Sequence, residues 1–291
     1  MGSCCSGTDR TARQSDGPCK LRHLAVLPGR ENNDSRGSAT KITNATLREL
    51  AASGAAIVTL RVARQKGVTS VSPLAASLRG LDASGDGCGI DDAGLIEATH
   101  LLELNARSNK TICTVAPFAA SLRKLDASRG CGINDAGLAQ STRILELDAA
   151  SNFKIRTIAP FAASLRKLDA SDLFCGIDDT GLYRATGIVE LKASWNSKIR
   201  TVTPFARSLR KLDASGACGI DDTGLAQASR IVVLNASNNA KISTVAPFAA
   251  SLRKLDASGF YCGIDDAGLT QASHNMQLNA SDNSKIRGVA P

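Results

Sequence analysis

Cysteine and aspartate are the residues of this 291-residue chain whose spacing could support chemistry. Five cysteines stand 43 or 44 residues apart, at Cys88, Cys131, Cys175, Cys218 and Cys262. Paired aspartates follow four of them at a fixed distance, at Asp91-Asp92, Asp178-Asp179, Asp221-Asp222 and Asp265-Asp266. Converging thiolates can hold zinc or form a disulfide, and converging carboxylates can hold calcium or exchange protons. Whether these groups converge depends on the elements that position them.

Those elements belong to a segment that recurs five times. The copies begin at Ser77, Ser121, Ser164, Ser208 and Ser251, and each contains two half-units of 21 to 23 residues. In the second copy the odd half-unit has the spacing L-x-x-L-x-A-x-x-x-C-x-I, formed by Leu122, Leu125, Ala127, Cys131 and Ile133. The even half-unit repeats that skeleton with Ile144, Leu147, Ala149, Asn152, Ile155, Ile158 and Phe161. A fixed period of this size predicts a solenoid, in which each unit buries its apolar face against its neighbours.

Both half-units fit the pattern L-x-x-L-x-L-x-x-N/C-x-L, and the chain from Ser77 onward resembles leucine-rich-repeat proteins. The odd half-units, such as CGIDDTGL from Cys218 to Leu225, are similar to the cysteine-containing, ribonuclease-inhibitor-like class. The resemblance implies an α/β solenoid with a curved parallel sheet on its concave side and short helices, 3₁₀ turns and extended segments on its convex side. The even half-units depart from that class because a proline stands where a helix would run, so we expect extended or 3₁₀ structure there. These prolines are Pro117, Pro160, Pro204 and Pro247.

The polar residues of the repeat are predicted to serve the fold. An asparagine in the turn after each even strand can satisfy backbone groups of adjacent coils, at Asn109, Asn152, Asn196, Asn239 and Asn283. Aspartates before a short apolar helix suit helix capping, whereas calcium needs six or more converging oxygens. The histidines, His23, His100 and His274, form no recognisable pair with a nucleophile. We therefore assign no catalytic residue, metal or cofactor, and expect no enzyme.

The repeat cysteines are predicted to be small buried hydrophobic residues. Successive members lie two coils apart, about 10 Å when stacked strands are about 4.8 Å apart. A disulfide needs Cα atoms within about 7 Å, and zinc needs sulfurs at about 2.3 Å. We therefore place the chain in a reducing compartment, and we assign no role to Cys113.

Charge is unevenly distributed along the chain. Residues 1–76 hold 11 Lys and Arg against 5 Asp and Glu, whereas residues 77–291 hold 24 against 22. A nucleic-acid-binding surface should show a basic stripe, so we expect none in the repeats. No run of eighteen apolar residues occurs, and we expect no membrane-spanning segment.

The N-terminus carries an acylation pattern. Gly2 follows Met1, and Ser6 completes M-G-x-x-x-[ST], the myristoylation pattern. Cys4 and Cys5 could take a second acyl chain, and stable anchoring takes either two chains or one chain with basic residues beside it. We predict lipidation at Gly2, Cys4 and Cys5, against the alternative that the match arises by chance.

Three segments are expected. Residues 1–20 are small and polar and should form a disordered leader. Residues 21–76 contain degenerate coils that should cap the core, as terminal repeats commonly must. Residues 77–291 hold the five double-coil repeats.

Two surfaces are candidates for partner binding. On the strands, one position alternates in charge from coil to coil, through Glu103, Lys124, Glu146, Lys167, Glu190, Lys211, Val233, Lys254 and Gln277. This ladder either neutralises itself or leaves Lys211 and Lys254 as a basic site, next to an acidic row at Asp82, Asp126, Asp169, Asp213 and Asp256. In the loops, the aromatic residues Phe153, Phe174 and Trp195 are 21 residues apart, and Phe260 and Tyr261 occupy an equivalent loop. They either anchor a protein partner or pack under their own loops.

The combined interpretation is a monomeric, non-catalytic scaffold for protein–protein interaction, tethered by its N-terminus to the cytoplasmic face of a membrane. The sequence does not identify the partner. The alternative, by family analogy alone, is the substrate-recognition subunit of a ubiquitin ligase, although no F-box is visible.

Overall fold

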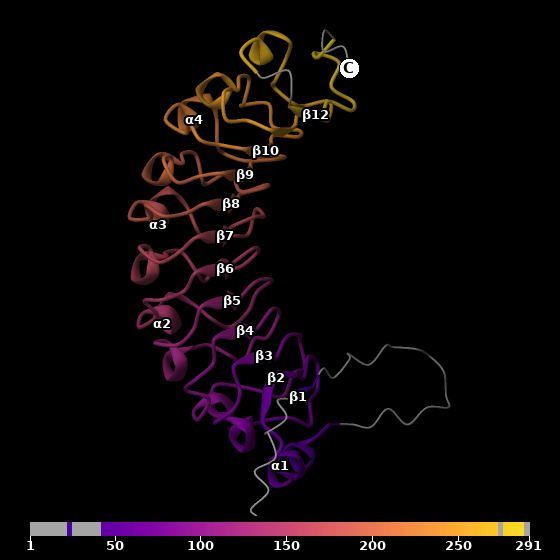
Figure 1. Cartoon of the computed structure of the whole chain (residues 1–291), viewed down its shortest axis with the longest axis vertical. Coiled ribbons are helices and arrows are strands. Elements are labelled where there is room, and N and C mark those ends of the chain that lie inside the picture. The colour runs from indigo at the N-terminus through magenta and orange to yellow at the C-terminus, as the bar shows by residue number, and fades with distance from the viewer. Residues whose placement is uncertain (1–21, 25–41, 273–275, 288–291) are drawn as a thin grey trace, which may run out of the picture.

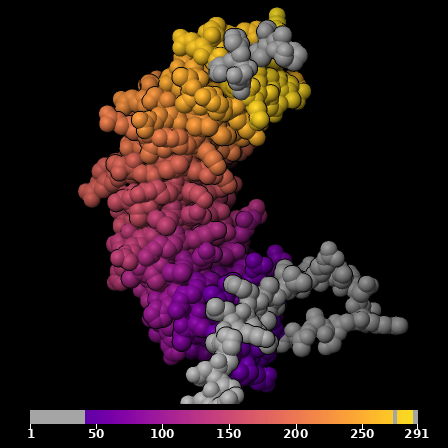
Figure 2. All heavy atoms as spheres, viewed as in Figure 1, coloured from indigo at the N-terminus to yellow at the C-terminus, as the bar shows by residue number. Residues whose placement is uncertain are grey.

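A computed structural model of the chain describes residues 22–24, 42–272 and 276–287. The chain winds into stacked coils, and each coil contributes one short strand to a single parallel sheet. Figure 1 shows the strands as a ladder toward the inner side of a curve, with the short helices along its outer side. Figure 2 shows the coils packed into one continuous curved body.

Twelve strands are found in the described residues, and their order in the sheet is their order in the chain. They are β1 (Arg22–Leu24), β2 (Ile57–Arg61), β3 (Gly80–Asp82), β4 (Glu103–Asn105), β5 (Lys124–Asp126), β6 (Glu146–Asp148), β7 (Lys167–Asp169), β8 (Glu190–Lys192), β9 (Lys211–Asp213), β10 (Val233–Asn235), β11 (Lys254–Asp256) and β12 (Gln277–Asn279). From β2 onward the register is constant, so equivalent residues of successive coils lie side by side.

Short helices turn the chain on the convex side. The α-helices are α1 (Asn44–Ala52), α2 (Asp135–Leu138), α3 (Asp179–Leu182) and α4 (Asp222–Leu225). The 3₁₀ helices are η1 (Ser72–Leu74), η2 (Ala93–Leu95), η3 (Ala116–Phe118), η4 (Ala159–Phe161), η5 (Thr203–Phe205), η6 (Ala246–Phe248) and η7 (Ala267–Leu269). Among the described helices, none has both the length and the apolar character required to span a membrane.

The prolines produce the predicted 3₁₀ turns. Each even coil from β2 to β10 turns through a 3₁₀ helix with proline at its first or second position. The odd coils differ from one another. In α2 and α4 the backbone N–H of the helix leucine donates to the residue four positions back, whereas in η2 and η7 it donates three positions back. The first and last odd turns are therefore tighter than the α-helix that the pattern predicts.

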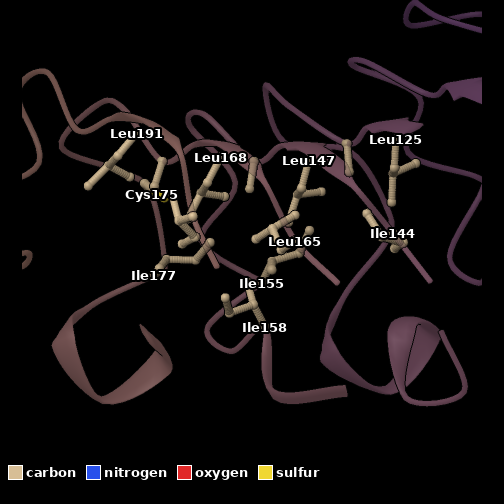
Figure 3. Close-up of a cluster of buried hydrophobic side chains, with 14 of the residues drawn as sticks. Leu125, Ile144, Leu147, Ile155, Ile158, Leu165, Leu168, Cys175, Ile177 and Leu191 are labelled. Atoms are coloured by element: carbon tan, nitrogen blue, oxygen red, sulfur yellow. The ribbon is translucent and has the colours of Figure 1, made fainter. Parts of the chain in front are cut away.

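The core is a row of leucines beneath the strands. In each three-residue strand the middle residue points inward, and its neighbours point to the concave surface. Figure 3 shows this row as Leu125, Leu147, Leu168 and Leu191. Ile155 and Ile158 lie below them, closer to the convex turns, and both are fully buried. Each such side chain removed from water contributes about 1.5–3 kcal/mol.

The asparagine ladder is confirmed as a link between coils. The Asn196 amide donates to the carbonyl oxygens of Ala170 (2.8 Å) and Ile177 (3.1 Å) in the preceding coil. Its own oxygen accepts from the Lys198 backbone N–H (3.0 Å). The same bonds to the preceding coil recur at Asn109, Asn152, Asn239 and Asn283. The side chain thus satisfies buried carbonyls that no strand reaches.

The two aspartates of each pair have different tasks, which the sequence pattern did not separate. Asp178 caps α3, because its carboxylate accepts from the Gly181 N–H at 2.9 Å. Asp179 instead accepts from the next coil, from the N–H groups of Arg200 (2.9 Å) and Thr201 (3.2 Å). The first aspartate therefore begins the helix, and the second joins neighbouring coils.

Gly181 shows why the repeat contains glycine in its helix. Its carbonyl accepts from the Ile158 N–H of the preceding coil (3.4 Å). A Cβ at this position would overlap the carbonyl oxygen of Arg156. Only glycine allows the coils to approach this closely.

The N-terminal coil follows the same plan with a longer helix. Thr43 and Asn44 stand in the positions of the aspartate pair, and Asn44 accepts from the N–H groups of Thr69 (2.9 Å) and Ser70 (3.3 Å). Within the segment 21–76, strand β1 pairs with β2. The leader at 1–20 lies outside the described residues.

The parallel sheet, the coil-to-coil register and the alternating turns make this an α/β leucine-rich-repeat solenoid.

Candidate functional site

The strand face carries the predicted charge ladder. Glu103, Lys124, Glu146, Lys167 and Glu190 face one another in register. The Lys167 ammonium lies 2.7 Å from the Glu146 carboxylate, and Lys124 lies 3.8 Å from it. The hydrogen bond from Lys167 lowers the pKa of Glu146 and raises that of Lys167. Exposed pairs of this kind contribute about 0–1 kcal/mol each, so the ladder chiefly neutralises itself.

The expectation that Lys211 lacks an acidic neighbour is wrong. Glu190 lies opposite Lys211 in the register, and its carboxylate is 3.8 Å from the Lys211 Nζ. Lys254 lies between Val233 and Gln277, as predicted. The two lysines therefore do not form an unpaired basic site together.

The acidic row is wider than predicted, because Asp148 joins it from an even coil. Asp126, Asp148 and Asp169 lie side by side on β5, β6 and β7. Each carboxylate accepts the backbone N–H two residues later, at 3.0 to 3.1 Å, and so closes the turn after its strand. Burial, and then the carboxylates on both sides, raise the pKa of Asp148 to about 6. Lys192 partly offsets this charge, since its ammonium is 3.4 Å from Asp169.

The five repeat cysteines are buried, as predicted, whereas Cys113 is exposed. Cys131, Cys175 and Cys218 are fully buried, and burial raises the pKa of each thiol to about 11. A thiol with such a pKa is a poor nucleophile and a poor metal ligand at neutral pH. Across the described ranges, no three His, Cys, Asp or Glu side chains come together in a way that could hold a metal ion.

The loops after the strands carry exposed apolar side chains, which we call the aromatic loop edge. Its members are Phe153, Leu173, Phe174, Trp195, Phe260 and Tyr261. The aromatic rings are between 54% exposed, for Trp195, and 78% exposed, for Phe260. More than half of each of these residues is therefore exposed to solvent, so none of the rings is enclosed by its own loop.

The other aromatic residues show how unusual this edge is. The chain has seven Phe, one Trp and two Tyr. Four phenylalanines are buried in the core, at Phe118, Phe161, Phe205 and Phe248. Five of the remaining six aromatics belong to the aromatic loop edge, and Tyr183 follows α3 on the convex side. Exposed aromatic residues thus concentrate on one edge.

Trp195 stands at a backbone position that disfavours it. Its φ is 60°, in the left-handed region. The equivalent residue of the other even coils is also left-handed, at Arg64, Ser108, Ser151, Asn238 and Asp282. This conformation costs roughly 1–2 kcal/mol for most side chains and least for Gly, Asn and Asp. Backbone conformation alone would favour Asn over Trp here.

Trp195 and Tyr261 line the same hollow, which the sequence did not predict. The hollow has a volume of about 510 Å³, and its floor includes Gly216 and Ala217. The Trp195 indole lies so close over Gly216 that a Cβ there would be 2.6 Å from the ring. Phe153 and Phe174 do not line it.

Loop length explains the hollow. In each odd coil a loop joins the serine that follows the strand to the repeat cysteine, as between Ser215 and Cys218. This loop has three residues in the first, third and fifth odd coils, but only two in the second and fourth. The fourth coil, with Gly216 and Ala217, is therefore short between longer neighbours. The alternation of 43 and 44 residues contained this signal, although it did not reveal which side chains would face each other.

The lipidation residues Gly2, Cys4 and Cys5 lie outside the described residues.

No family model and no curated protein sequence matched the chain. A search of solved structures matched a chain from the crystal structure of the Rad7 and Elc1 complex in yeast. The alignment covers 85% of both chains, with 14% identity and a TM-score of 0.44.

Proposed function

We propose that the chain is a non-catalytic leucine-rich-repeat scaffold that binds a protein partner through its aromatic loop edge. The observation that carries the proposal is the exposure of six large apolar side chains on this edge. Clustered exposed aromatic residues are typical of protein interaction sites, where Trp and Tyr commonly supply most of the binding energy.

The backbone of Trp195 supports the same proposal. A bulky residue in the left-handed region lowers stability relative to Asn, which the next even coil uses at Asn238. Unfavourable local conformations concentrate at functional sites. Exposure and backbone conformation thus independently support a binding role for Trp195.

The test is capture of interaction partners by the purified chain, followed by mass spectrometry. Replacement of Phe153, Phe174 and Trp195 by Ser should abolish capture and leave the thermal unfolding temperature nearly unchanged. Tyr183→Ser is the matched control, because Tyr183 is 58% exposed but lies outside the aromatic loop edge. Equal capture by the triple variant, or loss of capture with Tyr183→Ser, would contradict the proposal.

We also propose that acylation at Gly2, with Cys4 or Cys5, tethers the scaffold to the cytoplasmic face of a membrane. The support is the sequence pattern and the basic residues beside it, each worth about 1 kcal/mol near an anionic surface. A Gly2→Ala variant should move from the membrane fraction to the soluble fraction. An unchanged partition would remove the tether from the account.

The cysteine-containing class is the finer relationship that we propose for the repeats. Its support is the alternation of buried Cys175 in an odd coil with buried Asn196 in the next even coil. The alternative function, substrate recognition in a ubiquitin ligase, rests on family analogy. It expects ligase subunits among the captured proteins, and their absence would count against it.

A further inference from the structure

The hollow between Trp195 and Tyr261 has the properties of a side-chain receptor. Its volume of about 510 Å³ lies within the range of about 300–1,000 Å³ that is typical of ligand sites. Two aromatic side chains line it, and the short Gly216-Ala217 loop leaves it open. The hollow can therefore accept a large apolar side chain against aromatic surface.

Lys241 gives this hollow a positive charge. Within the described residues it is the only charged residue that lines the hollow. Its equivalents in the neighbouring even coils are engaged: Lys198 donates to the Cys175 carbonyl (2.8 Å) and Lys285 to the Cys262 carbonyl (2.9 Å). In the part of the chain that the structure describes, the Lys241 ammonium has no hydrogen-bond or ion-pair partner, and only the backbone N–H of Lys241 is bonded, to the Asn239 side chain (2.9 Å).

Loop length again accounts for the difference. Cys175 and Cys262 follow the longer loops, whereas Cys218 follows the short loop and its carbonyl receives no bond from Lys241. The same shortening therefore opens the hollow and leaves an ammonium group available beside it. A partner carboxylate would find a charge complement there, and a basic partner would be repelled.

We propose that the hollow binds a short acidic segment of a partner protein, with one aromatic side chain between Trp195 and Tyr261 and an adjacent carboxylate on Lys241. This inference rests on the proposed function of the aromatic loop edge and specifies the chemistry of the partner. Phe260 is 78% exposed but does not line the hollow, so it has no part in it.

The experiment is a selection of peptides on the full chain. A random dodecapeptide library is bound to the wild-type chain after counter-selection on a Trp195→Asn variant. The enriched peptides should combine Phe, Tyr or Trp with neighbouring Asp or Glu. No enrichment, enrichment of basic peptides, or enrichment without an aromatic residue would each overturn the inference.

Trp195 is the only tryptophan, so its fluorescence reports on the hollow directly. An enriched peptide that lacks Trp should change its emission saturably. Lys241→Thr, which copies Thr111 of an earlier coil, should weaken binding roughly tenfold, and Tyr261→Ser should weaken it at least as much. Phe260→Ser is the control and should leave binding unchanged. Undiminished binding by Lys241→Thr would overturn the charge assignment.

The outcomes separate this inference from the proposed function. Suppose that the triple variant loses the partner while Lys241→Thr and Tyr261→Ser still capture it. This result would support binding through the aromatic loop edge and contradict binding in the hollow. If peptides bind in the hollow but the chain captures no protein partner, the proposed scaffold function is contradicted.

Discussion

The charged carboxylate of Asp148 should lower the free energy of unfolding at neutral pH, compared with a neutral side chain at the same position. Its pKa is raised from 3.8 to about 6, first by burial and then by the carboxylates of Asp126 and Asp169. Because the folded-state pKa lies above the unfolded one, the folded state binds the proton more tightly. Stability is therefore higher at low pH and is lost as pH rises through about 6.

The magnitude follows from that shift. About two pKa units correspond to about 3 kcal/mol at 1.36 kcal/mol per unit. Asp148 is only partly buried, so solvent screening reduces this to about 1–2 kcal/mol. Asp148→Asn removes the charge and keeps the turn, since Asn105 and Asn235 close equivalent turns with their side-chain oxygens.

Thermal unfolding measured between pH 4.5 and pH 7.5 tests this reasoning. At pH 7.5 Asp148→Asn should raise the unfolding temperature by roughly 3–6 °C, at about 2–4 °C per kcal/mol for a chain of this size. At pH 4.5 only about a third of the gain should remain, because the folded state has then taken up the proton. Asp256→Asn is the control, since its neighbours across the sheet are Asn235 and Asn279. No gain at pH 7.5, or an equal gain at both pH values, would refute the electrostatic argument.

Two further substitutions test the polar interior. Ser141→Ala should raise the free energy of unfolding by about 1 kcal/mol, because the buried Ser141 hydroxyl has no hydrogen-bond partner and Ala185 fills the equivalent place in the next copy. A drop in the denaturant midpoint would show that the hydroxyl is satisfied. Asn196→Ala should lower the free energy of unfolding by about 2–4 kcal/mol, since it leaves the buried carbonyls of Ala170 and Ile177 without the hydrogen bonds that the Asn196 amide donates. A loss below about 1 kcal/mol in chemical denaturation would remove the asparagine ladder as a link between coils.

The fold could be predicted because each coil repeats the same local instructions. The spacing of Leu125 and Ala127 defines a strand, Asn152 marks its turn, and Pro160 excludes an α-helix from the even coil. Translation of that unit then fixes the sheet, so very little depends on contacts distant in sequence.

The candidate site was only partly predictable, because it depends on differences between coils. Phe153, Phe174 and Trp195 attracted attention by their spacing, yet Trp195 shares its hollow with Tyr261, three coils further along. That pairing depends on the short loop between them. Asp148 was likewise missed, because even coils place Asn, Asp or Lys at this position without a fixed rule.

Partner capture by a Trp195→Asn variant tests the central claim most directly. Asn suits the left-handed backbone at this position, so the variant should unfold at or above the wild-type temperature while losing its partner. A variant that unfolds several degrees earlier and still captures the partner would show that the indole supports the fold, and would contradict the assignment of this edge to binding.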